Sequence, residues 1–239
     1  MTATPGVLHL IPITLGDDQN ALTMLPASTL ATVVVLDYFV VENEKSARRF
    51  LKSAAHPRPM RELDIERFNK DDNEARATQL LQPVLQGRSA GVLSEAGCPA
   101  IADPGALLVA AAHRCHIRVV PHVGPASLLL ALMASGFNGQ QFAFHGYLPV
   151  PRDQCGKALQ ALEDASRAND VTQIFIETPY RNDAMLATLL EICRPETRLC
   201  VASDLTLATE AVHSMAISEW KSTNHVVGRR PSVFVLYAR

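Results

Sequence analysis

The chain has 239 residues, which is enough for one large or two small domains with a sizeable buried core. Hydrophobic residues make up 48% of it and charged residues 19%, a composition that is typical of globular proteins and excludes disordered and fibrous classes. The formal net charge of -2 gives no global positive field, so a nucleic acid would have to bind a local basic patch.

In the first half of the chain, short apolar runs alternate with segments of helical periodicity. The runs that predict strands are residues 6–11, 32–36, 40–43, 90–93 and 117–120. The segments that predict helices are residues 44–55, 73–86, 104–115 and 126–135. Residues 61–72 are polar and predicted to be irregular. The helix at 44–55 carries a basic face, which is either solvated or in contact with nucleic acid.

The second half of the chain continues the alternation. Its predicted strands are residues 142–144, 174–176, 199–202, 212–216 and 232–237, and its predicted helices are residues 155–168 and 182–193. Strands and helices that alternate in this way indicate an α/β fold. We expect two α/β domains, an N-terminal one at residues 1–122 and a C-terminal one at residues 123–239.

A loop rich in glycine and proline separates the predicted strand at 90–93 from the next helix. Its sequence is Ser94-Glu95-Ala96-Gly97-Cys98-Pro99-Ala100-Ile101-Ala102-Asp103-Pro104-Gly105. Proline fixes φ and glycine permits close backbone approach, so we expect a rigid loop. We also expect Asp103 to be the N-cap and Pro104 the first residue of the helix. Because ligands bind beyond the carboxyl ends of parallel strands, this loop is a candidate ligand site.

A second loop of the same kind follows the next predicted strand. Its sequence is Pro121-His122-Val123-Gly124-Pro125-Ala126-Ser127. Two such loops in one half of the chain could face a single site, which favours a ligand site over plain structural turns. The Gly16-Asp17 pair after the first strand is a weaker signal, since most such turns are structural.

Several enzyme classes lack their motifs in this sequence. There is no H-E-x-x-H, G-x-x-x-x-G-K-[ST] or G-x-S-x-G motif, and no G-x-G-x-x-G after the first strand. Their absence argues against zincins, P-loop NTPases, α/β-hydrolases and an ordinary dinucleotide site. His113 and His116 lie near a helix end, where a cap or surface role is favoured over a metal site. Two donor-rich loops with few acid or base groups suit a cofactor that is itself reactive, such as a sulfonium methyl donor.

The five cysteines and the N-terminus bear on the cellular compartment. The cysteines are scattered and form no C-x-x-C pair, which favours reduced thiols over a disulfide framework or a zinc site. The N-terminus lacks the basic and apolar regions of a signal peptide, and no run of about 18 apolar residues is present. We therefore expect a soluble, cytoplasmic protein without a metal or a membrane segment.

Three segments in this order resemble a known family. They are Ser94 to Pro99 with Asp103-Pro104-Gly105, then Val120 to Ser127, then Phe144-His145-Gly146-Tyr147-Leu148-Pro149. Together they resemble the tetrapyrrole methylase superfamily, and most of all its ribosomal RNA small-subunit 2'-O-methyltransferase branch. The resemblance runs from Leu10 to Tyr237. It implies two α/β domains with S-adenosylmethionine in the cleft between them, and a homodimer.

The resemblance also implies roles for individual residues. Cofactor contacts fall on Pro12, Ile13, Ser94, Glu95, Ala96, Gly97, Ile101, Asp103, Gly124, Pro125, Ala126, Ser127, Thr178, Leu205 and Pro231. Candidate catalytic groups are Glu42, Glu74 and Arg181, and candidate substrate contacts are Lys70, Asn73, Tyr180 and Glu210. Glu42 or Glu74 could accept a hydroxyl proton, and Arg181 could hold a phosphate.

Three functions stay open at this point. The first is S-adenosylmethionine-dependent methylation of an RNA oxygen, at the ribose 2' position. The second keeps the methyl donor but takes a tetrapyrrole or another small molecule as acceptor, which a large, neutral, apolar cleft would favour. The third is a non-catalytic protein that binds S-adenosylmethionine with the same fold.

Overall fold

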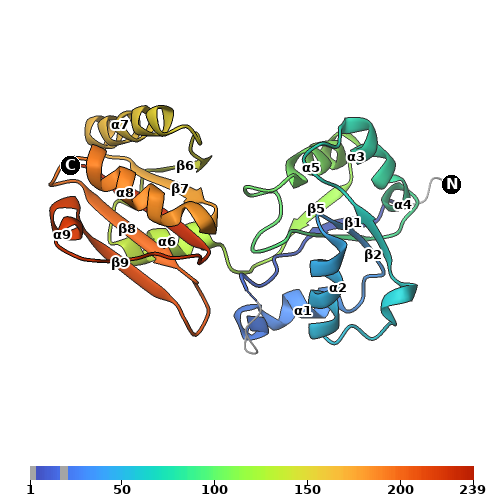
Figure 1. Ribbon diagram of the computed structural model, residues 1–239. Coiled ribbons are helices and arrows are strands. Elements are labelled where there is room, and N and C mark those ends of the chain that lie inside the picture. Colours follow the sequence, from blue (N-terminus) through green and yellow to red (C-terminus); the bar gives the residue numbers. More distant parts are fainter. Residues whose placement is uncertain (1–3, 17–20) are drawn as a thin grey trace. The chain divides into compact units, whose positions relative to one another are not determined.

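The computed structural model describes residues 4–16 and 21–239, so Asp17 of the glycine-aspartate pair lies outside the described residues. The chain divides into two compact units, Met1–Ala126 and Ser127–Arg239, hereafter unit 1 and unit 2 (Figure 1). The boundary that we predict after residue 122 lies in the same loop as this division. Each unit has its own sheet and its own hydrophobic core.

Unit 1 contains a five-stranded parallel sheet in the order β3-β2-β4-β1-β5. Its strands are β1 (Val7–Leu10), β2 (Tyr38–Val41), β3 (Asp64–Arg67), β4 (Ala90–Leu93) and β5 (Arg118–Pro121). Every residue of β2 and β4 is buried, as expected of inner strands with helices on both faces. Parallel strands end at one edge, so the loops after β1, β2, β4 and β5 gather there.

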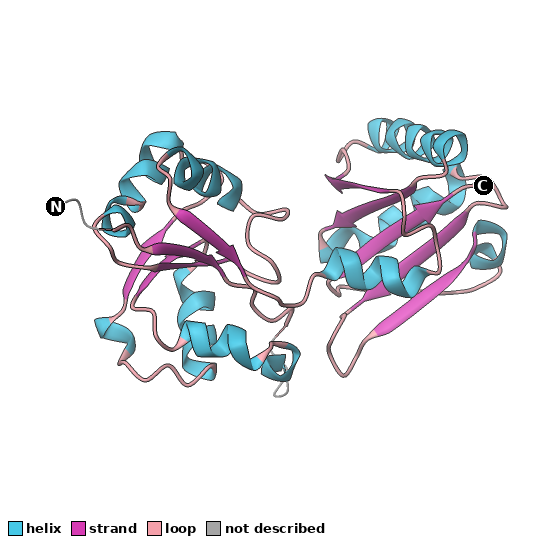
Figure 2. Cartoon of the chain, turned by 180° about the vertical axis from the view of Figure 1, so that it is seen from behind, coloured by secondary structure: helices cyan, strands magenta, loops and turns pink. Residues whose placement is uncertain are grey.

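Helices cover both faces of the unit 1 sheet (Figure 2). They are α1 (Ala27–Val33), α2 (Glu44–Ser53), α3 (Glu74–Leu80), α4 (Gln82–Leu85) and α5 (Gly105–Arg114), with short 3-10 turns η1 (Ala21–Met24) and η2 (Met60–Glu62). Side chains alternate between the faces, so Val40 packs with α3 and α5 while Phe39 packs with α1 and α2. The sheet thereby holds two separate cores and leaves its carboxyl edge to the loops.

Unit 2 contains a mixed sheet in the order β6-β7-β10-β8-β9. Its strands are β6 (Phe142–Tyr147), β7 (Thr172–Glu177), β8 (Arg198–Ser203), β9 (Ala211–Ala216) and β10 (Ser232–Tyr237). Only β6 and β7 pair in parallel, and the other neighbours are antiparallel. Its helices are α6 (Ser127–Ser135), α7 (Arg152–Asn169), α8 (Asn182–Ile192) and α9 (Ile217–Lys221), with a 3-10 turn η3 (Pro179–Arg181).

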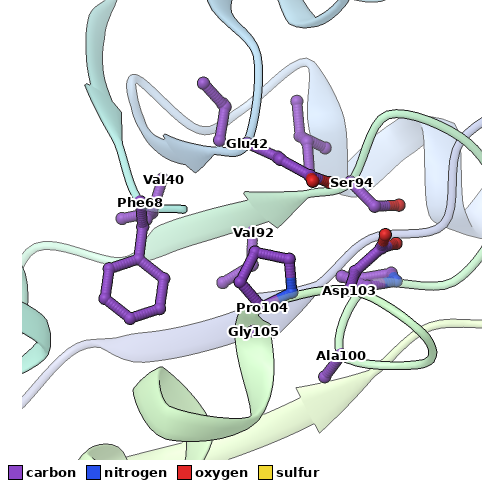
Figure 3. A pocket seen from close by; sticks show the side chains of 12 residues that line it. Val40, Glu42, Phe68, Val92, Ser94, Ala100, Asp103, Pro104 and Gly105 are labelled. Atoms are coloured by element: carbon purple, nitrogen blue, oxygen red, sulfur yellow. The ribbon is translucent and has the colours of Figure 1, made fainter. Parts of the chain in front are cut away.

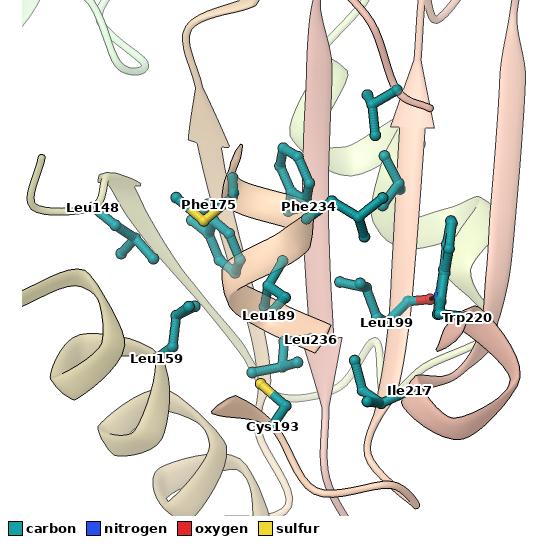
Figure 4. Close-up of a cluster of buried hydrophobic side chains, with 14 of the residues drawn as sticks. Leu148, Leu159, Phe175, Leu189, Cys193, Leu199, Ile217, Trp220, Phe234 and Leu236 are labelled. Atoms are coloured by element: carbon teal, nitrogen blue, oxygen red, sulfur yellow. Dashed lines mark hydrogen bonds between the residues drawn. The ribbon is translucent and has the colours of Figure 1, made fainter. Parts of the chain in front are cut away.

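One hydrophobic core joins α7, α8 and α9 to the unit 2 sheet (Figure 4). Phe175 and Phe234 stack with their ring centroids 5.6 Å apart, and Leu159 and Leu189 are fully buried in the same core. The indole of Trp220 donates a hydrogen bond to the Leu199 carbonyl at 2.9 Å. This packing fixes α8, whose first residues lie at the end of β7.

Two of the predicted elements in unit 1 are wrong. Residues 32–36 do not form a strand, because α1 runs to Val33 and buries Thr29 and Val33 four residues apart, which is the helical period. Residues 61–72 are not wholly irregular, because they contain β3. This strand lies at the edge of the sheet and is partly exposed, so it lacks the apolar alternation that would reveal it.

Across residues 4–16 and 21–239, no helix has the length and apolar character needed to cross a membrane. No group of three or more His, Cys, Asp or Glu residues in the same ranges is arranged to hold a metal ion.

Candidate cofactor and acceptor site

Three loops at the carboxyl edge of the unit 1 sheet contact one another. After β1, the Ile13 amide donates to the Gly97 carbonyl at 2.9 Å, which joins this loop to the one after β4. The Cys98 thiol in turn lies 3.5 Å from the Pro125 carbonyl, which joins the loop after β4 to the one after β5. The two Gly-Pro loops therefore belong to one contiguous structure.

Two glycines allow this close approach. Gly97 has φ +71, and a Cβ added to it would lie 3.1 Å from Leu15 and 3.4 Å from the Pro125 carbonyl. Gly124 is more restricted in space, since its added Cβ would lie 2.3 Å from the Cβ of Pro12. The backbone of Gly124, in the loop after β5, therefore packs directly against the ring of Pro12, in the loop after β1.

Two alanines in the loop after β4 occupy the left-handed region. Ala100 has φ 67 and Ala102 has φ 63. This conformation costs an L-residue roughly 1–2 kcal/mol, and such strain persists only where the surroundings enforce it. Gly105 supports the turn, because a Cβ there would lie 3.1 Å from the Ala100 nitrogen. Strain of this kind is concentrated at functional sites.

The predicted cap of the following helix is wrong. Helix α5 begins at Gly105, its N-cap is Pro104, and no side chain caps it. Asp103 instead directs its carboxyl toward Glu42, which follows β2, and toward Ser94 (Figure 3). The left-handed turn at Ala100 and Ala102 places Asp103 over the end of the sheet, which local sequence could not reveal.

Glu42 and Asp103 form a hydrogen-bonded carboxyl pair. Burial, reinforced by the negative charges of Glu42 and Glu95, raises the pKa of Asp103 to about 7. Burial and the charge of Glu95 also raise the pKa of Glu42. Because two close carboxylates resist carrying two charges, the pair shares one proton near neutral pH.

The carboxyl pair lines a pocket at the ends of β2 and β4. The pocket has a cavity volume of about 10 Å³, room for about one water, and its apolar walls include Val40, Phe68 and Pro104. Glu42 Oε2 is buried and accepts no hydrogen bond from a nitrogen or hydroxyl of the described residues. The proton shared with Asp103 or a donor on a ligand would satisfy this oxygen.

The three predicted cofactor residues of unit 2 lie at one edge of its sheet. Thr178 follows β7 and donates from its amide to Glu177 Oε1 at 2.7 Å. Leu205 follows β8, and Pro231 precedes β10, where its carbonyl accepts from the Asp204 amide at 2.9 Å. Since β10 lies between β7 and β8, these residues are neighbours across the sheet.

Comparison with known proteins identifies the family. The family model of tetrapyrrole (corrin/porphyrin) methylases matches residues 8–220. The chain belongs to this family. The methylase is 30% identical to the ribosomal RNA small subunit methyltransferase I of Vibrio cholerae over 215 residues. The aligned residues are 89% of this chain and 69% of the Vibrio cholerae protein. It is 32% identical over 210 residues to the protein of that name from Xylella fastidiosa, covering 88% and 72% of the two chains.

Solved structures of methyltransferases share the fold of this methylase. The uroporphyrin-III-C-methyltransferase from Thermus thermophilus superposes with a TM-score of 0.57 at 19% identity, over 97% of this chain and 92% of that chain. The methyltransferase CobJ superposes with a TM-score of 0.63 at 17% identity, over 98% and 100%. Family and fold together make this chain a methyltransferase with two α/β units, as the sequence motifs indicate.

Other predicted site residues of the methylase have structural partners. Asn73 caps α3, with its side chain accepting from the Arg76 amide at 3.0 Å. Glu74 lies on α3, 3.3 Å from Arg114 on α5, and is absent from the walls of the Glu42 pocket. Glu210 accepts from the Thr206 amide at 2.7 Å, and Lys70 is exposed in the turn before α3. These contacts do not bring Glu74 to the carboxyl pair.

Sequence reasoning missed one residue that organises the unit 2 edge. Asn182 is fully buried at the start of α8, and its side-chain nitrogen donates to the Gly228 and Arg230 carbonyls at 2.9 and 2.8 Å. It thereby holds the loop that leads into β10 beside Ser203 and Ser232, whose hydroxyls are 2.7 Å apart. A single asparagine at a helix start normally indicates an N-cap, so the sequence did not predict that Asn182 would be buried and would bridge two carbonyls.

Proposed function

We propose that this methyltransferase uses S-adenosylmethionine to methylate the ribose 2' oxygen of a nucleotide in small-subunit ribosomal RNA. RNA as the methyl acceptor is supported by the likeness, over most of both chains, to proteins named ribosomal RNA small subunit methyltransferase I. The carboxyl pair at the edge of the unit 1 sheet supports an oxygen acceptor, because a hydroxyl must lose a proton on methylation.

The loops of unit 1 fit S-adenosylmethionine as a cofactor. Their glycines and strained alanines expose backbone close to the carboxyl edge, where a side chain at residue 124 would collide with Pro12. We assign the cofactor to the predicted residues of these loops and of the unit 2 edge: Pro12, Ile13, Ser94, Glu95, Ala96, Gly97, Ile101, Asp103, Gly124, Pro125, Ala126, Ser127, Thr178, Leu205 and Pro231. The cofactor supplies an electrophilic methyl group on a sulfonium, so the protein must provide orientation and a proton acceptor.

The Glu42–Asp103 pair is our candidate for that proton acceptor. Near neutral pH the pair holds one proton and one negative charge, and both carboxyls line the pocket. At a pH near the pKa of about 7, a fraction of the pairs has also lost the shared proton. In that form one carboxylate takes the proton of the acceptor hydroxyl, and this proton then forms the hydrogen bond between the two carboxyls. We assign this role to the pair rather than to Glu74, whose carboxylate is 67% exposed and paired with Arg114.

A small-molecule acceptor is the second candidate, and the apolar lining of the same pocket favours it. Val40, Phe68, Val92, Pro99 and Pro104 surround the carboxyls. Such walls suit the face of an apolar ring better than a phosphate chain. The cavity volume of about 10 Å³ is far below the roughly 300–1,000 Å³ of ligand pockets, so such a molecule would lie against the mouth of the pocket rather than inside it.

Methyl transfer from labelled S-adenosylmethionine decides between the two acceptors. The protein is incubated with unmodified small-subunit ribosomal RNA and, separately, with uroporphyrinogen. We expect label in the RNA, in a nucleotide that resists alkaline cleavage because its 2' oxygen is methylated. Label in the tetrapyrrole alone would overturn the RNA assignment, and calorimetry without S-adenosylmethionine binding would overturn the cofactor assignment.

We also propose that the protein works as a homodimer in the cytoplasm. Support comes from the family resemblance and from Leu129 and Met133, which lie one turn apart on α6 and are 49% and 78% exposed. Light scattering of the purified protein tests the assembly, and a mass of one chain at all concentrations would refute it.

A further inference from the structure

A buried carboxylate fixes one arginine at the surface of unit 2. The Glu177 side chain is 1% exposed, and its Oε1 accepts from the Thr178 amide and hydroxyl at 2.7 and 3.1 Å. Its Oε2 lies 3.3 Å from a guanidinium nitrogen of Arg181, whose side chain is 22% exposed. A buried charge requires a partner, so Glu177 holds Arg181 in one place. The arginine is therefore preorganised, unlike an ordinary surface arginine.

Arg181 lines an open hollow between α7 and α8. The hollow has a volume of about 340 Å³, and Arg152, the first residue of α7, lines it too. Its remaining walls are mainly small or apolar, including Cys155, Ala184 and Met185. Arg181 is paired with Glu177 and Arg152 with Glu191, so the opening presents two guanidinium groups with their donors but no net positive charge.

Exposed aromatic and apolar side chains surround this opening. Tyr180, next to Arg181 in η3, is 71% exposed. Val150, in the loop between β6 and α7, is 70% exposed, and Tyr147, the last residue of β6, is 60% exposed. The Val150 carbonyl accepts from Arg181 at 3.4 Å, so this loop and η3 are in contact. We call residues 147–152 and 179–181 the Tyr180 rim.

We infer that the Tyr180 rim binds single-stranded RNA, with Arg181 on a phosphate and Tyr180 stacked on an unpaired base. This inference rests on the proposed RNA acceptor and names the surface that binds this RNA. Exposed aromatics beside arginine are the chemistry that recognises single strands, because every base offers a stacking face and every nucleotide a phosphate. Duplex RNA would leave Tyr180 without a base, since paired bases are already stacked.

The test measures RNA affinity and S-adenosylmethionine affinity separately. The probe is a fluorescein-labelled single-stranded RNA of about a dozen nucleotides, a length within the site sizes of single-strand binders. We expect Tyr180→Ala to weaken RNA binding about tenfold, because stacking on one aromatic contributes that much. S-adenosylmethionine binding by calorimetry stays at the wild-type value. Phe142→Ala, which removes an aromatic that is 45% exposed at the other end of β6, is the matched control.

Arg181 is tested by charge and by geometry. Arg181→Gln is expected to lower the slope of log affinity against log salt by about 0.7, the value for one phosphate on a single strand. Arg181→Lys keeps the charge next to Glu177 and so protects the fold, but it loses the guanidinium fork and weakens binding severalfold. Arg167→Gln is the control, because Arg167 forms a surface pair with Glu196 near the far end of α7.

The outcomes separate this inference from the proposed function. Wild-type protein that binds the RNA probe while Tyr180→Ala and Arg181→Lys bind it equally well would overturn the Tyr180 rim and leave the RNA acceptor standing. Wild-type protein that binds no RNA and methylates only a tetrapyrrole would overturn the proposed acceptor itself. A 2-aminopurine in the probe adds a direct readout, since stacking on Tyr180 quenches its fluorescence and Tyr180→Ala restores it.

Discussion

The carboxyl edge of the unit 1 sheet and the corresponding edge in unit 2 handle their polar groups in opposite ways. In unit 1, Glu42 and Asp103 are two acids forced together, and the loop that carries Asp103 is strained at Ala100 and Ala102. In unit 2, Asn182 bridges two carbonyls, and Glu177 faces Arg181. Unit 1 thus sets acid against acid, whereas unit 2 sets an amide donor against carbonyls and a carboxylate against a cation. Glu177 Oε2 and the side-chain oxygen of Asn182 nevertheless accept no hydrogen bond from the described residues.

This difference indicates that the unit 1 edge is suited to proton transfer and the unit 2 edge to presenting a contact surface of fixed shape. Proton transfer at neutral pH needs a group whose pKa lies near 7, and the shared proton of Glu42 and Asp103 provides one. A contact surface needs fixed positions, and the bonds of Asn182 and Glu177 provide them.

Loss of the carboxylate at residue 42 is expected to have the largest effect. Glu42→Gln keeps the size of the side chain but removes the negative charge of the pair, so the methyl-transfer rate falls about 100- to 10,000-fold. S-adenosylmethionine affinity changes little. Turnover assays with RNA measure the first quantity and calorimetry the second. Glu62→Gln, at an exposed position in η2, is the control. Normal turnover in Glu42→Gln together with loss in Glu74→Gln would move the role to Glu74.

A methyl group at residue 124 is expected to damage the unit 1 edge next most. Gly124→Ala places a Cβ 2.3 Å from the Cβ of Pro12, so the loops after β1 and β5 must separate. We expect a loss of about 3 kcal/mol in the free energy of unfolding and of most S-adenosylmethionine binding. Thermal and denaturant unfolding measure the stability. Gly139→Ala is the control, because no atom lies within 4 Å of its added Cβ. Equal stability of the two variants would contradict the packing at Pro12.

Removal of the clamp in unit 2 tests the other edge. Asn182→Ala deletes the donor to the Gly228 and Arg230 carbonyls and leaves both without this partner, at a cost of about 2 kcal/mol. If that edge serves shape, KM for the cofactor rises more than kcat falls, because the loop into β10 moves. Asn169→Ala removes an exposed asparagine at the end of α7 and is the control. A pure loss of kcat with unchanged KM would place Asn182 in the chemistry instead.

The elements that sequence predicted best are those whose patterns arise locally. Strand β10 is predicted with its observed ends, and β4 likewise, because buried apolar runs are bounded by glycine, proline or polar residues. Helix α2 follows from its basic and apolar faces, whereas its N-cap, Asn43, stood inside the predicted strand 40–43. Strand β3 escaped prediction because an exposed edge strand needs no apolar pattern.

The candidate site likewise has one part that the sequence predicted and one part that it did not. The Gly-Pro loops could be read from sequence, since glycine and proline constrain the backbone whatever surrounds them. The partnership of Glu42 with Asp103 could not, because it joins residues 42 and 103 through two loops and depends on left-handed turns at two alanines. Asn182 escaped for the same reason, as its partners lie in the loop before β10.

The smallest expected effect is a pH dependence of stability that belongs to unit 1. Burial and its acidic neighbours raise the pKa of Asp103 from 3.8 to about 7, so the folded protein holds a proton that the unfolded chain releases above pH 4. The stabilising contribution is therefore complete below about pH 4 and is lost as the pH rises toward 7. Denaturant unfolding at intervals across this range measures it. In Asp103→Asn the side chain cannot titrate, so its decline between pH 4 and 7 should be shallower than that of the wild type. A shift of about three pKa units would correspond to about 4 kcal/mol, and solvent screening of this partly exposed carboxyl reduces the expected difference to on the order of 1 kcal/mol. Parallel curves for the two proteins would show that Asp103 ionises normally, and the contrast between the two edges would then rest on geometry alone.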